Sequence, residues 1–176
     1  MHLSGAFGNP NSNLNKCLKE WFPEAFGVEL TVGKWYKGNS EFESLICITE
    51  LSKESNSERE YTKINYYGFL NGNYKKESAI ANLEHELSLR EATPEEVKEA
   101  LIAEAVKRGL TKGKYCSFGI SYREGLIDSD DYFYDQTHKV FLCGSNSLMD
   151  YKGKWAEIIP TITKAEAELQ LNAKII

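Results

Sequence analysis

The pattern of apolar and polar positions predicts an opening helix, a β-rich section, a central helix, a second β-rich section and a closing helix. The clearest element is residues 92–110, ATPEEVKEALIAEAVKRGL, where apolar side chains recur at helical spacing. Thr93 and Glu96 have the spacing of a capping box. Pro94 falls at the first helical position, and Gly109 provides a stop. We therefore predict a capped helix that packs one apolar face on a sheet.

The section before this helix is rich in β-branched and aromatic residues, which favour strands. Polar stretches separate its strand-like segments, which are residues 28–38, 43–51, 60–70 and 85–91. The Asn-Gly pair in NGN at 71–73 predicts a tight hairpin turn into one more strand. Five short strands in this order predict a small antiparallel barrel, of which an SH3-like barrel is one form, or an antiparallel meander.

The section after the helix contains three more strand-like segments, residues 114–124, 130–144 and 148–159. The polar stretches DQTH and YKGK within them are predicted turns. Short strands that follow one another directly along the chain favour antiparallel pairing. We therefore predict a second antiparallel meander with one face packed on the central helix.

Both ends of the chain are predicted to be helical, although the alternation near the C-terminus also fits a strand. Ser12 caps an apolar stripe at helical spacing, and Thr163 with Glu166 repeats the capping-box pattern before residues 164–172. The fold class is therefore α+β. A length of 176 residues fits a single compact domain, residues 1–176, and the alternative is a subdivision into 1–91 and 92–176.

The composition is that of a globular protein, with 41% apolar and 27% charged residues. Its apolar runs are too short to span a bilayer, and the N-terminal sequence lacks the pattern of a signal peptide. We therefore expect no membrane partner, and the four cysteines indicate a reducing cytoplasm. The net charge of −5 argues against duplex DNA as a partner.

No catalytic or metal-binding motif stands out in the sequence. The cysteines lie in apolar segments without Cys-x-x-Cys spacing. The aspartate-rich stretch DSDDYFYD fails the EF-hand pattern, because Phe133 replaces the required glycine and Lys139 the required glutamate. A nucleophile formed by Cys143 and His138 would require the fold to bring the two together. We predict no catalytic residue, no metal and no cofactor.

Residues 91–176 resemble the C-terminal part of small accessory proteins encoded by tailed bacteriophages. The resemblance is carried by EATPEEVKEALIAEAVKRGLTKGKY, DDYFYDQTHKVFLCGS, YKGKWAEII and TKAEAELQL. Gly153, Trp155 and Ala156 match the pattern of that group, and we expect Trp155 to have a packing role. The resemblance implies a protein that acts in the cytoplasm of an infected bacterium, and it implies no reaction.

The sequence as a whole favours a non-catalytic binding protein that sequesters or blocks a host component, which we expect to belong to an antiviral defence system. The target is either a defence protein or a small nucleotide signal, and a nucleotide would need an aromatic platform beside basic groups. A virion or assembly component and a small hydrolase are the alternatives, and a homo-oligomer is compatible with each. The candidate binding residues are Trp35, Tyr36, Lys37, Tyr122 and Arg123.

Overall fold

The computed structural model describes residues 28–38, 43–55, 60–80, 89–118, 125–161 and 169. The predicted opening helix lies outside the described residues. Within the predicted closing helix Leu169 alone is described, as a helical residue with 83% of its surface exposed. The chain divides into two compact units, Met1–Ala92 and Thr93–Ile176, and each is described by itself below.

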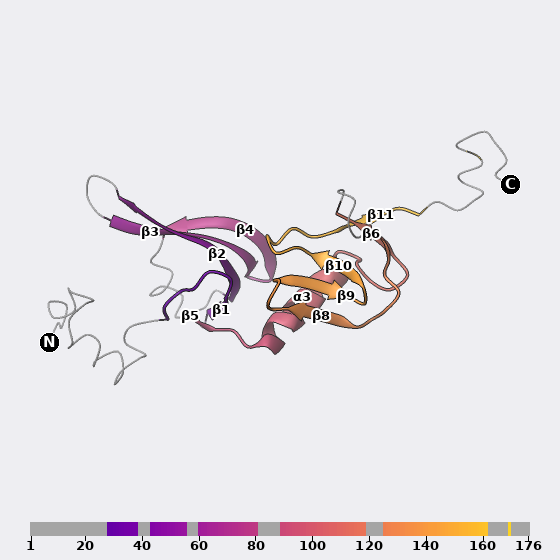
Figure 1. Cartoon of the computed structure of the whole chain (residues 1–176), viewed down its shortest axis with the longest axis horizontal. Helices are drawn as coiled ribbons and strands as arrows, with labels where there is room; N and C mark the ends of the chain where they lie inside the picture. The colour runs from indigo at the N-terminus through magenta and orange to yellow at the C-terminus, as the bar shows by residue number, and fades with distance from the viewer. Residues whose placement is uncertain are drawn as a thin grey trace. The chain divides into compact units, whose positions relative to one another are not determined.

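The first unit contains a five-stranded antiparallel sheet with the strand order β4-β3-β2-β1-β5 (Figure 1). Its strands are β1 (Trp35–Gly38), β2 (Ser44–Ser55), β3 (Glu60–Leu70), β4 (Asn73–Ile80) and β5 (Leu89–Glu91). The first four strands form the predicted meander, and β5 pairs with the other side of β1. Because β5 pairs with β1 and not with β4, the described sheet is open and the predicted barrel is not closed.

Local backbone chemistry fixes the hairpin between β3 and β4. Asn71 and Gly72 have φ values of 50° and 70°, which a two-residue hairpin turn requires, and this confirms the turn predicted from the Asn-Gly pair.

Gly68 lies in β3 where β2 approaches closely. A Cβ atom at Gly68 would lie 2.7 Å from the Cα atom of Ile46 and would overlap the carbonyl oxygen of Leu45. The pairing of the two longest strands therefore depends on a glycine at this position.

Both faces of this sheet bear buried apolar side chains, in keeping with the alternation of a strand. The side chains of one face form a core cluster of Leu30, Tyr36, Ile46, Ile48, Ile64, Tyr66 and Leu89. Buried residues that alternate with these along the strands are Trp35, Leu45, Cys47, Tyr67 and Phe69. Trp35 contacts Tyr67 edge-on, with ring centroids 5.4 Å apart. The aromatic residues of this sheet thus serve largely in packing.

The second unit begins with the central helix, α3 (Pro94–Lys107), which confirms the prediction. The Glu96 N–H donates to the hydroxyl of Thr93 over 3.2 Å, and the Thr93 N–H donates to the Glu96 carboxylate over 3.0 Å. These two bonds form the predicted capping box and satisfy N–H groups that a helix start leaves unpaired. Gly109, with φ 75°, follows the last turn.

The strands of the second unit form two small antiparallel sheets (Figure 1). One contains β8 (Tyr132–Asp135), β9 (Val140–Cys143) and β10 (Asn146–Met149), and the other contains β6 (Tyr115–Ser117), β7 (Gly125–Leu126) and β11 (Glu157–Ile159). The prediction of one meander is wrong in this respect. After a turn that begins at Asp150, the chain forms a bridge between Trp155 and Met149 and then pairs with β6.

An aromatic cluster fills the core of the second unit, where α3 lies against β8. The ring of Tyr132 stacks on Phe141 at 5.8 Å, and Phe141 meets Trp155 edge-on at 5.9 Å. The guanidinium of Arg108 lies 5.2 Å from the centre of the Trp155 ring and also bonds to the buried carboxylate of Glu104. Trp155 is 6% exposed, so its predicted packing role is confirmed.

Candidate functional site

Trp35, Tyr36 and Lys37 lie in β1, in the interior of the five-stranded sheet. Tyr36 is 1% exposed, and its hydroxyl accepts from the Thr31 N–H at 2.8 Å and donates to a backbone carbonyl. Trp35 is 6% exposed, and strand alternation turns it and Lys37 to the face opposite Tyr36. The two rings have packing roles, and a binding role for this trio stays a prediction.

Tyr122 and Arg123 lie outside the described residues, in the segment between β6 and β7. Their role in binding stays a prediction. The strands on either side of them are described, and these strands contain a feature that sequence reasoning missed.

Three exposed apolar side chains form a row across the sheet of β11, β6 and β7. Ile159 of β11 pairs with Tyr115 of β6, and Tyr115 pairs with Leu126 of β7. Residues paired directly across antiparallel strands share a face, so the three side chains are neighbours on one side of the sheet. They are 37%, 36% and 52% exposed, respectively. We call Ile159, Tyr115 and Leu126 the surface row.

Two side chains on the opposite face of the same sheet are buried. Cys116 and Ile127, which alternate with Tyr115 and Leu126, are both fully buried. Burial raises the pKa of the Cys116 thiol, so the thiol form, which is a poor nucleophile, is favoured. The surface row therefore lies on strands that are packed from behind at Cys116 and Ile127.

Both edges of this small sheet are restricted as sites for a further strand. At the β7 edge, the side-chain amide of Asn146 donates to the Leu126 carbonyl over 2.8 Å. Asn146 also approaches so closely that a Cβ atom at Gly125 would overlap its side-chain oxygen. At the β11 edge, Pro160 follows Ile159 and has no N–H to donate. A partner would therefore meet the face of the sheet rather than extend it.

An exposed carboxylate flanks the surface row. Glu157 precedes Ile159 by two residues along β11, and Asp128 follows Leu126 by two residues. Because side chains two residues apart in a strand share a face, the Glu157 side chain lies on the side of the surface row, whereas the Asp128 carboxylate lies beside Gly144. Neither forms a salt bridge within the described part of the chain. Alternation turns Lys114, which precedes Tyr115, toward the other face.

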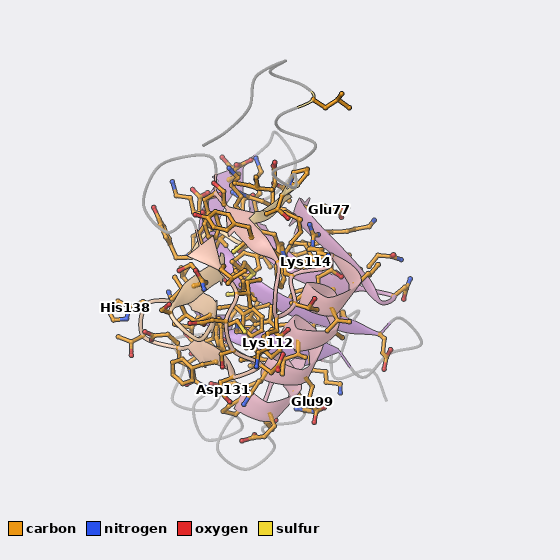
Figure 2. All side chains as sticks on the ribbon, turned by 90° about the vertical axis from the view of Figure 1, so that its right-hand side faces the viewer. Glu77, Glu99, Lys112, Lys114, Asp131 and His138 are labelled. Atoms are coloured by element: carbon orange, nitrogen blue, oxygen red, sulfur yellow. The ribbon has the colours of Figure 1, made fainter. Side chains whose placement is uncertain are left out.

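The possible nucleophile pair of Cys143 and His138 is not assembled. The Cys143 thiol donates to the Ser129 carbonyl over 3.0 Å, and its pKa is raised by burial and by the nearby Asp130, Asp131 and Asp128. The exposed imidazole of His138 contacts the Asp135 carboxylate at 2.6 Å and points away from the strands (Figure 2). Each group is thus held by a different partner.

The aspartates of this unit form turns. Asp135 accepts from the N–H groups of Thr137 and His138, and Asp150 accepts from those of Lys152 and Lys154. Within the described ranges, His, Cys, Asp and Glu side chains form no group of three or more that could hold a metal ion. The structure also contains, in those ranges, no helix with the length and apolar character needed to cross a membrane.

No family model, curated protein or solved structure matches this chain. The surface row is therefore the candidate site on the strength of its geometry alone. It combines apolar side chains, strands that are packed from behind and a charged neighbour, Glu157, which are features of a protein contact.

Proposed function

We propose that this protein is a non-catalytic binding protein that occupies or sequesters a host component in the cytoplasm of an infected bacterium. The observation that carries the binding role is the surface row of Ile159, Tyr115 and Leu126. Contiguous exposed apolar side chains cost free energy in water and are covered in protein complexes. The partner is therefore a protein, and the phage-like sequence of residues 91–176 supports a component of an antiviral defence system.

The first test is capture of the full chain from bacteria that carry a defence system, with and without phage infection. We expect a host protein at stoichiometric amount with the unchanged chain and its loss with Leu126→Ser. Val106→Ser is the matched control, since Val106 is an apolar residue of α3 with 54% exposure and lies outside the surface row. Equal capture by both variants, or no partner at all, would contradict the proposal.

A virion or assembly component remains the second candidate, because an exposed apolar row also suits a fixed oligomer. Mass spectrometry of purified virions separates the two functions. Stoichiometric copies in virions would favour the structural role, whereas their absence from virions together with a row-dependent host partner would favour sequestration.

A small nucleotide is the alternative target, either at Trp35, Tyr36 and Lys37 or at Tyr122 and Arg123. Native mass spectrometry of the captured full chain tests this, because a bound nucleotide would add its mass to the protein. Release of an unchanged nucleotide on denaturation would indicate binding without turnover, and release of a hydrolysed one would favour the hydrolase alternative.

A further inference from the structure

The hairpin turn between β3 and β4 contains the single Asn-Gly pair of the sequence, Asn71 and Gly72. The side chain of an asparagine can react with the backbone nitrogen of the next residue, and a glycine at that position obstructs the reaction least because it has no Cβ atom. Both residues are exposed, and even a Cβ atom at Gly72 would meet nothing within 4 Å. The turn therefore leaves room around the two groups that would react.

The same two groups are not held by hydrogen bonds. Within the described part of the chain, neither the side-chain amide of Asn71 nor the N–H of Gly72 has a hydrogen-bonding partner. The turn is held by other atoms of Asn71, because its N–H donates to the Glu43 carbonyl over 2.8 Å and its carbonyl accepts from the Asn73 side chain over 3.2 Å. The reacting nitrogen and the reacting side chain thus remain unbonded.

The other asparagines of the described ranges are in a different situation. The Asn65 side chain forms two hydrogen bonds, and that of Asn73 donates to the Asn71 carbonyl. The Asn146 side chain is buried and donates to a backbone carbonyl over 2.8 Å. Each of these three is followed by a tyrosine or a serine. Asn71 therefore differs from them both in its neighbour and in its freedom from hydrogen bonds.

We propose that Asn71 is a site of spontaneous deamidation and isomerisation, with water as the co-reactant. When base removes the Gly72 amide proton, the nitrogen attacks the side-chain carbonyl carbon of Asn71, and ammonia leaves as a succinimide ring closes. Water then opens the ring. Opening at the side-chain carbonyl gives aspartate, and opening at the main-chain carbonyl gives isoaspartate. The site belongs to the first unit and does not depend on the proposed function.

Isoaspartate would change the backbone of the turn. The main chain would then run through the former side chain, which lengthens it by the Cβ atom. A two-residue turn fits the direct pairing of Leu70 with Asn73, and a longer connection does not keep that geometry. Isomerisation should therefore loosen the hairpin where β4 forms one end of the described sheet.

The test is incubation of the full chain in warm, mildly alkaline buffer, followed by peptide mapping with mass spectrometry. We expect conversion of the amide to an acid at Asn71 before Asn65, Asn73 or Asn146, with isoaspartate detected through methylation by protein isoaspartate methyltransferase. Asn71→Gln is the matched control, because its longer side chain closes the ring less readily, and it should lose the product. Product formed only in denaturant would show that the folded turn protects Asn71 and would overturn the proposal.

A second measurement separates the longer backbone from the new charge. Asn71→Asp has the charge of the product and an unchanged backbone. The isoaspartate form, isolated by chromatography, should melt at a lower temperature than Asn71→Asp and should show faster hydrogen exchange in β4. Formation of aspartate alone, or equal melting and exchange of the two forms, would overturn the isomerisation and its effect on the hairpin. Equally fast conversion of another described asparagine would overturn the choice of site.

Discussion

The large sheet of the first unit and the β11-β6-β7 sheet of the second unit use the same antiparallel pairing at different scales. β2 and β3 are 12 and 11 residues long, whereas the strands of the small sheet have two or three residues. The large sheet bears buried apolar side chains on both faces, and the small sheet leaves the surface row exposed on one. The small sheet relies on neighbouring elements for support, through bonds such as Asn146 to Leu126 and Ala156 to Leu148. Substitutions in the surface row should therefore cost less stability than substitutions in the large sheet.

Gly68→Ala should give the largest effect, because it breaks the large sheet at its closest backbone approach. The added Cβ atom would overlap the Leu45 carbonyl, and Gly68 has φ 150°. We expect a loss of about 5 kcal/mol in the free energy of unfolding, which lies at the top of the range for single substitutions. Gly72→Ala is the control, since its Cβ atom meets nothing within 4 Å and strain at φ 70° should cost about 1 kcal/mol. Similar denaturant midpoints for the two variants would contradict this account.

Trp155→Ala tests the support behind the small sheet. Removal of this buried ring leaves a cavity beside Phe141 and Arg108, which should cost about 3 to 5 kcal/mol. Tyr115→Ala in the surface row should cost less than about 1 kcal/mol, because its side chain is exposed. Thermal unfolding of both variants provides the comparison. If the Tyr115 variant proved the less stable, the surface row would be part of the core.

Asn146→Ala tests how much the hydrogen bond at the β7 edge contributes to the stability of the small sheet. It leaves the part-buried Leu126 carbonyl without its side-chain donor, at an expected cost of about 1 to 3 kcal/mol. Asn73→Ala removes an exposed bond to the Asn71 carbonyl and should change stability by less than about 0.5 kcal/mol. Hydrogen exchange should also become faster around β7 in the Asn146 variant. Unchanged exchange there would show that the small sheet holds without this bond.

The smallest expected effect is a pH dependence at the β8–β9 turn. Backbone and side-chain hydrogen bonds from His138 lower the pKa of Asp135 below its ordinary value. A carboxyl with a lowered pKa in the folded state adds stability above its unfolded pKa and loses that contribution as the pH falls through the folded pKa. The difference in melting temperature between the unchanged chain and Asp135→Asn should therefore shrink in acid. A difference that stays constant with pH would exclude this ionisation as its cause.

The elements that could be predicted from the sequence are those whose signals are local. Thr93, Glu96 and Pro94 specify the start of α3 within a few residues, and Asn71 with Gly72 specifies the hairpin turn. Strand partners depend on contacts between distant segments. The sequence therefore did not reveal that β11 leaves the sheet of β10 to pair with β6.

The candidate site was missed for the same reason. The sequence indicated a binding site at Trp35, Tyr36 and Lys37 because these residues are adjacent. In the strand, however, Tyr36 lies on the face opposite Trp35 and Lys37, and both rings are buried. Tyr115 and Leu126 each precede a buried residue. Apolar residues at neighbouring positions indicate a strand with apolar side chains on both faces, but they do not indicate which face is exposed to water. The surface row became visible once the register placed these residues opposite each other.

The boundary between the two units has a consequence for exchange of segments between genes. Ala92 donates to the Trp35 carbonyl and completes the bonds of the first unit, and Thr93 begins the capping box of the second. Ala92 and Thr93 are adjacent, so no residue lies between this hydrogen bond and the capping box. Recombination at the peptide bond between Ala92 and Thr93 would keep the Ala92 hydrogen bond in the first unit and the capping box in the second. A crossover one residue further along would remove Thr93 from α3, and loss of this cap would cost about 1 kcal/mol of stability. The two units could therefore be exchanged separately only by recombination at this one peptide bond.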